Sequence, residues 1–282
     1  MITRYLDPTN DITFKKVFSD KGRLMDFLNA VLRLKEGEKI EHIDFISQEE
    51  LPSFEAGRRS IFDLKCVDQS KKTYIIEMQN KPEASFLNRV QCYAAHAYVS
   101  QAIKGKSHDH LMPVILLSLT PRNLFEEDID CISYHLNVES KTKRRYLFSL
   151  SYVFIELSKF KKTQEELTSV EDYWLYFLTG WQKTDTPPST IKDPFVLEAY
   201  EAIEQYKLTE AEYDAYLKSR LALEADDLMM NKTFKDGEKL ATKKIALQMH
   251  AMGIEIETIS KAVDLSSSEI EEILKEKKPF AE

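Results

Sequence analysis

Hydrophobic residues recur every three or four positions over the first part of the chain, which is the spacing of one face of a helix. These positions are Phe14, Val17, Phe18, Leu24, Phe27, Leu28 and Val31. The polar segment SDKGR interrupts the pattern and predicts two helices rather than one. Thr9 or Asn10 is suited to cap the first helix, because a short polar side chain can accept a hydrogen bond from its first turn.

Alternating or continuous apolar runs follow, and these are typical of strands. Predicted strands cover residues 40–47, 58–68, 72–80, 112–120 and 147–156. The second and third flank the polar turn DQSKK and predict a β-hairpin, whereas MPVILLSLT is apolar enough for the middle of a sheet. Between them, residues 84–105 have helical spacing and end at Gly105.

From Glu165 onward all the patterns are helical, over 169–181, 194–206, 209–230, 232–252 and 255–276. A Pro-containing connection at 183–193 is a candidate linker. The sequence therefore predicts a mixed α/β domain over 1–162, followed by a helical region over 163–282. We expect that helical region to pack as a bundle or layer against the α/β core.

Composition narrows the class of protein. The 282 residues carry a net charge of −8, and the acidic excess lies in the helical half, so a general nucleic-acid coat protein is disfavoured. No apolar run approaches the length of a membrane span, and no signal-peptide pattern opens the chain, so we expect a soluble cytoplasmic protein. Cys66, Cys92 and Cys131 are scattered, which favours reduced thiols over disulfides or a zinc site.

The hairpin places two acidic residues inside its strands. With the turn centred near Ser70, antiparallel partners bring Asp63 opposite Glu77, on the face shared with Lys65 and Gln79. Like charges directly opposed on neighbouring strands are destabilising, so the pair needs a compensating partner. A shared divalent cation is one, since Mg²⁺ and Mn²⁺ prefer oxygen ligands.

Two other interpretations of this pair stay open. In the first interpretation, Asp63 and Glu77 face solvent and are neutralised by Lys65 and Arg58. In the second, the register of the hairpin differs by one or two residues, which separates the two carboxylates.

The motifs around the pair resemble a known group of enzymes. An Asp on one strand and Glu-x-Gln on the next resemble the PD-(D/E)XK nuclease superfamily, and the chain closely resembles its Rpn family of recombination-promoting nucleases and putative transposases. The resemblance covers much of residues 7–160 and rests on NDITFKKVF, SIFDLKC, IIEMQ, FLNRVQCYAAHAY and HLMPVILLSL. It implies a restriction-endonuclease-like αβββαβ core with a mixed sheet, followed here by helices.

The resemblance also implies roles for the hairpin residues. Asp63 and Glu77 would bind Mg²⁺ or Mn²⁺, with the Met78 carbonyl as a third ligand. Gln79 occupies the position of the superfamily's lysine and lacks its charge, for which Lys65 is a candidate substitute. The implied activity is metal-dependent hydrolysis of DNA phosphodiester bonds by an endonuclease, linked to recombination or transposition-like events.

Arg89 and Tyr93 follow IEMQ on a predicted helix, where the resemblance implies contact with the nucleic acid. The alternative is a solvated arginine and an ordinary core tyrosine. Residues 254–276 resemble a helix-turn-helix, but their acidity favours packing or partner binding over reading a DNA groove. The rival function is therefore a non-catalytic relative whose helical half binds a protein partner, and self-association through those helices is a further expectation.

Overall fold

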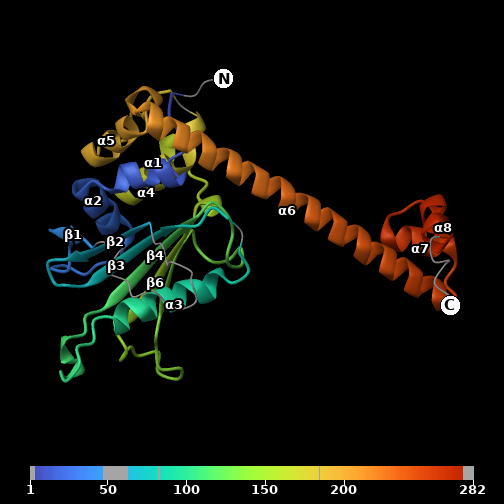
Figure 1. The fold of residues 1–282 in the computed structure, drawn as a ribbon, viewed down its shortest axis with the longest axis horizontal. Helices are drawn as coiled ribbons and strands as arrows, with labels where there is room; N and C mark the ends of the chain where they lie inside the picture. Colours follow the sequence, from blue (N-terminus) through green and yellow to red (C-terminus); the bar gives the residue numbers. More distant parts are fainter. Residues whose placement is uncertain (1–3, 47–62, 82, 184, 276–282) are drawn as a thin grey trace. The chain divides into compact units, whose positions relative to one another are not determined.

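A computed structural model describes residues 4–46, 63–81, 83–183 and 185–275 of the chain. Six strands form one sheet in the order β1-β2-β3-β4-β6-β5 (Figure 1). The strands are β1 (Ile43–Phe45), β2 (Leu64–Asp68), β3 (Thr73–Met78), β4 (Val114–Thr120), β5 (Ile132–Leu136) and β6 (Leu150–Glu156). The central strands β3, β4 and β6 are parallel, and the outer pairings are antiparallel. This mixed sheet confirms the predicted α/β core.

Several of the helices begin directly after a polar residue whose side chain caps the first turn. They are α1 (Asp11–Phe18), α2 (Lys21–Val31), α3 (Phe86–Val99), α4 (Val170–Gly180), α5 (Pro194–Ala202), α6 (Glu210–Ala251), α7 (Ile256–Val263) and α8 (Ser267–Lys275). Asn10 and Asp20 cap α1 and α2 by accepting hydrogen bonds from Ile12 and Arg23, respectively. None of the described helices is both long and apolar enough to cross a bilayer.

Helices cover both faces of the sheet. Figure 1 shows α1, α2, α4 and α5 on one side and α3 on the other. On the first face, Cys66, Tyr74 and Ile76 pack with the buried residues of the four helices. On the second face, Ile75 and Phe154 pack against α3. The alternation of side chains along β2 and β3 therefore separates an apolar core face from the face that carries the acidic pair.

Some elements differ from the sequence predictions. The strand β5 was not predicted, because ISYHL is a short edge strand with a histidine in it. The helix predicted over 84–105 ends at Val99, and Gly105 lies beyond it with a φ of +83°. The two helices predicted over 209–252 form the single helix α6, and the helix predicted over 255–276 is the pair α7 and α8. Residues 58–62, including Arg58, lie outside the described residues.

The chain packs as two compact units, residues 1–221 and 222–282. The division falls after Leu221 and not after Lys162, where the sequence pattern changes. The reason is that α4 shares the core of the first unit: Trp174 contacts Phe18 and Phe27 at ring-centroid distances of 5.5 and 5.6 Å. In the second unit, Ile259 and Ile270 pack α7 and α8 against the end of α6.

Trp174 therefore tests whether α4 belongs to the core. Its ring is fully buried, and its Nε1 donates to the Asp26 carboxylate at 2.7 Å. We expect Trp174→Ala to lower the free energy of unfolding by about 3–5 kcal/mol, as for other large aromatics removed from a core. The measurement is urea denaturation, with Tyr206→Ala as the exposed control. Equal free energies for the two variants would contradict this packing.

Candidate active site

The register of the hairpin sets its two acidic residues against each other. In the observed pairing Leu64 faces Ile76 and Lys65 faces Ile75. Asp63 directly precedes β2, so the same register continues to Asp63 opposite Glu77. The predicted register is confirmed, and the alternative register that would separate the carboxylates is wrong.

Asp63 is held by groups from two directions. Its Oδ2 accepts a hydrogen bond of 2.7 Å from the Met78 backbone N–H, which joins it to β3. Its Oδ1 lies 3.3 Å from Nζ of Lys15 on α1. A hydrogen bond of 2.6 Å from Asn80 Nδ2 to the Thr9 carbonyl anchors the start of α1 to the end of β3. The helix α1 is thereby fixed beside the carboxylate.

Glu77 is buried although it is acidic. Only 5% of the residue is exposed, so the interpretation of a solvent-facing pair is wrong. Its Oε1 lies 3.6 Å from Nη2 of Arg89, and no hydrogen bond from any described residue reaches its buried Oε2. Burial and the nearby charge of Asp63 raise the pKa of Glu77 to about 8, and Arg89 offsets this only in part.

Gln79 and Arg89 are joined by a hydrogen bond next to this carboxylate. Arg89 Nη2 on α3 donates to Gln79 Oε1 at 2.5 Å, and Gln79 Nε2 donates to the Lys81 carbonyl. Both ends of the Gln79 amide are therefore engaged. Arg89 therefore brings a positive charge from α3 beside Gln79 and Glu77.

The ring of Tyr93 supports Arg89. The guanidinium lies 5.4 Å from the ring centroid of Phe86 and 5.6 Å from that of Tyr93, within the range of cation–π contacts. It also lies 3.3 Å from the Glu83 carboxylate. Tyr93 is thus a packing residue for the arginine, and Arg89 is an arginine with defined partners rather than a solvated one.

The structure places the other predicted site residues on the same hairpin. Lys65 lies on the face of β2 that carries Asp63, two residues along the strand and opposite Ile75. Met78 lies between Glu77 and Gln79 and pairs with Leu119 of β4.

The sequence analysis did not identify three polar residues that lie beside the Asp63–Glu77 pair, namely Asp11, Lys15 and Ser118. Lys15 and Asp11 lie one turn apart on α1, and burial together with the charge of Asp63 raises the pKa of Asp11. Ser118 pairs with Glu77 across β3 and β4, and its buried Oγ has no hydrogen-bond partner among the described residues. The i, i+4 spacing of Asp11 and Lys15 was visible in NDITFKKVF, but the packing of the helix was not.

The oxygens at this site suit a hard divalent cation. Among the residues that the structure describes, no group of three or more His, Cys, Asp or Glu side chains has metal-binding geometry. Mg²⁺ is commonly held by only one or two carboxylates, with water and phosphate oxygens completing its shell. The opposed carboxylates of Asp63 and Glu77 meet that requirement, and Glu77 Oε2 is buried without a hydrogen-bond partner from the described residues.

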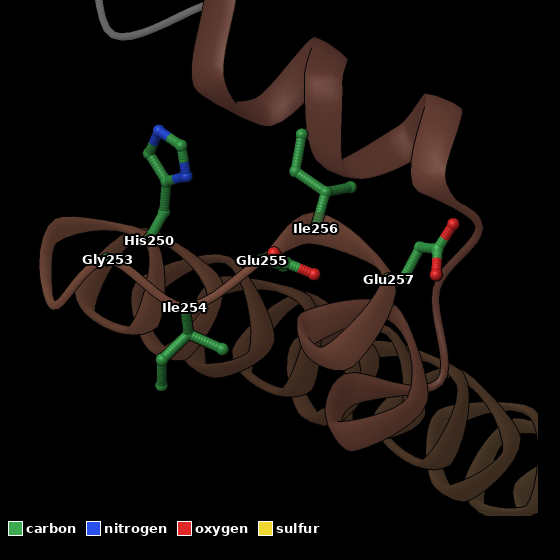
Figure 2. Close-up of a pocket in the computed structure, with 6 residues that line it drawn as sticks. All are labelled: His250, Gly253, Ile254, Glu255, Ile256 and Glu257. Atoms are coloured by element: carbon green, nitrogen blue, oxygen red, sulfur yellow. The ribbon is translucent and has the colours of Figure 1, made fainter.

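A hollow in the second unit offers no comparable chemistry. It lies where α6 meets α7, and its lining includes His250, Ile254 and Glu257. Figure 2 shows that these three side chains point in different directions rather than toward a common point. The hairpin remains the candidate site.

Comparison with known proteins gives one finding. A family model described as PD-(D/E)XK nuclease family transposase matches residues 8–233, which include every residue of the candidate site. This match confirms the resemblance noted in the sequence. No curated protein and no solved structure shows a significant match.

The raised pKa of Glu77 predicts how stability depends on pH without metal. In the unfolded chain, Glu77 loses its proton when the pH rises above its usual pKa of 4.5. In the folded protein, Glu77 keeps this proton up to a pH of about 8. The melting temperature should therefore fall as the pH rises through this interval. Glu77→Gln carries no titrating proton, so its melting temperature should fall less.

Thermal melts in EDTA across this interval measure the effect. Glu83→Gln is the matched control, because Glu83 contacts the same Arg89 and is exposed. Parallel pH profiles for wild type and Glu77→Gln would show that Glu77 is not the group that titrates.

Proposed function

The chain belongs to the PD-(D/E)XK nuclease family transposases, and from this membership we propose that it is a divalent-metal-dependent DNA endonuclease. It hydrolyses phosphodiester bonds, and this cleavage contributes to recombination or transposition-like events. The observation that carries the proposal is the Asp63–Glu77 pair, in which buried Glu77 lies opposite half-buried Asp63 and its Oε2 has no hydrogen-bond partner among the described residues.

Asp63, Glu77 and the Met78 carbonyl would hold Mg²⁺ or Mn²⁺. Bound there, the ion would supply a water of lowered pKa and stabilise charge on the phosphate. The chain supplies the rest of the site. The Met78 N–H and Lys15 hold the two oxygens of the Asp63 carboxylate in place. Because the pKa of Glu77 is about 8, a cation bound there would displace its proton near neutral pH.

Arg89 takes the electrostatic role that the superfamily gives to lysine. Its guanidinium is fixed by Gln79 and supported by Tyr93, and 27% of its side chain is exposed, so a DNA phosphate can reach it. Gln79 then acts as a positioning residue that orients Arg89. Lys65 is the rival source of charge, from the same sheet face.

Asp63→Asn tests the site directly. The substitution removes a charge that would bind the cation while leaving the size of the side chain unchanged. We expect cleavage of plasmid DNA with Mn²⁺ to fall by about 10³-fold or more, since a metal supplies several kcal/mol of transition-state stabilisation. Asp44→Asn is the control, because Asp44 is an exposed carboxylate paired with Lys21.

Full cleavage by Asp63→Asn would contradict the assignment of the site. Failure of the wild-type protein to cleave DNA with Mg²⁺ or Mn²⁺ would contradict the proposed activity and favour the non-catalytic alternative.

Arg89→Ala and Lys65→Ala distinguish the two sources of positive charge. We expect Arg89→Ala to lower the cleavage rate by about 10²–10³-fold, the usual effect of losing one transition-state donor. Lys65→Ala should have little effect. We also expect Gln79→Lys to lower the rate, because the new ammonium would repel Arg89. Steady-state cleavage rates measure all three, and a severe loss in Lys65→Ala with an active Arg89→Ala would assign the charge to Lys65 instead.

A further inference from the structure

The second unit contains a helix segment whose apolar side chains face solvent. Within the part of α6 that belongs to this unit, six large apolar residues are between 48% and 73% exposed: Leu228, Met229, Met230, Phe234, Leu240 and Ile245. Helices of soluble proteins usually gain most of their stability by burying an apolar face. Among the described residues, no apolar face covers these side chains, and two of them, Met230 and Phe234, lie on a single line along the helix.

One line along the helix has the spacing of a coiled-coil seam. Its members alternate in steps of four and three, the 3.5-residue repeat that keeps one stripe on a partner helix. We call them the α6 seam: Leu223, Asp227, Met230, Phe234, Gly237, Ala241, Lys244 and Gln248. All of them lie in the unit formed by residues 222–282. All are exposed except Leu223, which is half-buried.

Antiparallel pairing of two such seams matches each residue with a complement. Phe234 of one copy meets Gly237 of the other, and Met230 meets Ala241, so a large side chain faces a small one in both pairs. Asp227 meets Lys244, so opposite charges face each other. Leu223 meets Gln248 at the ends. Parallel pairing would set each of these residues against itself, including like charges at Asp227 and at Lys244.

Gly237 provides the strongest evidence for a partner. Glycine inside a helix destabilises it relative to alanine, so its presence needs a reason. A Cβ added at Gly237 would have no atom within 4 Å, so nothing in the described part of the chain requires the small residue. A phenylalanine from another helix does require it.

The charges along α6 favour the same orientation. Glu224, Asp226 and Asp227 lie near the start of the seam, and Lys239, Lys243 and Lys244 lie near its end. Antiparallel pairing brings the acidic end of one copy beside the basic end of the other, in addition to any interaction within one helix. Charge patterns of this kind set the orientation of helix pairs.

We propose that two copies of the chain associate through antiparallel pairing of the α6 seam, with Phe234 of each copy packed over Gly237 of the other. This proposal is independent of the nuclease activity. The family description does not assign it, and the matched family region ends at residue 233, within the seam.

Sedimentation equilibrium of the full-length chain tests it. The wild type should have twice the mass of the chain at micromolar concentrations, a range typical of modest interfaces. Gly237→Leu should weaken dimerisation by at least about tenfold while helix content by circular dichroism stays the same or rises. Leu228→Ala should remain dimeric, because Leu228 lies off the seam. A monomeric wild type, or a Gly237→Leu variant that dimerises as the wild type does, would overturn the proposal.

Two compensating variants keep the test independent of any loss of folding. Exchanging the two residues, Phe234→Gly with Gly237→Phe, preserves the large–small pair and should restore the dimer. Asp227→Lys should weaken the dimer, and adding Lys244→Asp should restore it. Failure of both exchanges to restore association would overturn the antiparallel pairing.

Discussion

The antiparallel pairing of β2 with β3 is the constraint on which the candidate site depends. It sets half-buried Asp63 against buried Glu77, so that ionising both carboxyl groups would bring two negative charges together. The protein compensates in part with the Met78 N–H and with the cations Lys15 and Arg89. The remaining imbalance appears as a pKa of about 8 for Glu77. A divalent cation would remove that imbalance, and this links the hairpin geometry to metal-dependent chemistry.

Two of the helices that cover the sheet, α1 and α3, each bring a positive charge to the site. The helix α1 places Lys15 on the Asp63 side, and α3 places Arg89 on the Glu77 side. Gln79 accepts a hydrogen bond from Arg89. In our proposal Arg89 on α3 therefore supplies the positive charge that the superfamily's lysine would supply from the strand.

The sequence predicted those features that depend on local pattern. Alternation and the turn near Ser70 were enough for the hairpin register, and therefore for the Asp63–Glu77 pair. The roles of Lys15 and Arg89 depend on how helices pack on the sheet, which spacing along one chain does not determine. The helix α6 was predicted as two helices because its middle is polar and contains Gly237, whose role depends on a second copy in our proposal.

The most direct test of the metal site is anomalous diffraction from crystals of the full-length protein soaked in Mn²⁺. Our account predicts a peak between the carboxylates of Asp63 and Glu77, within coordination distance of an oxygen of each, and no such peak in crystals of Asp63→Asn. A Mn²⁺ peak bound by other residues, with the hairpin carboxylates uncoordinated, would contradict it.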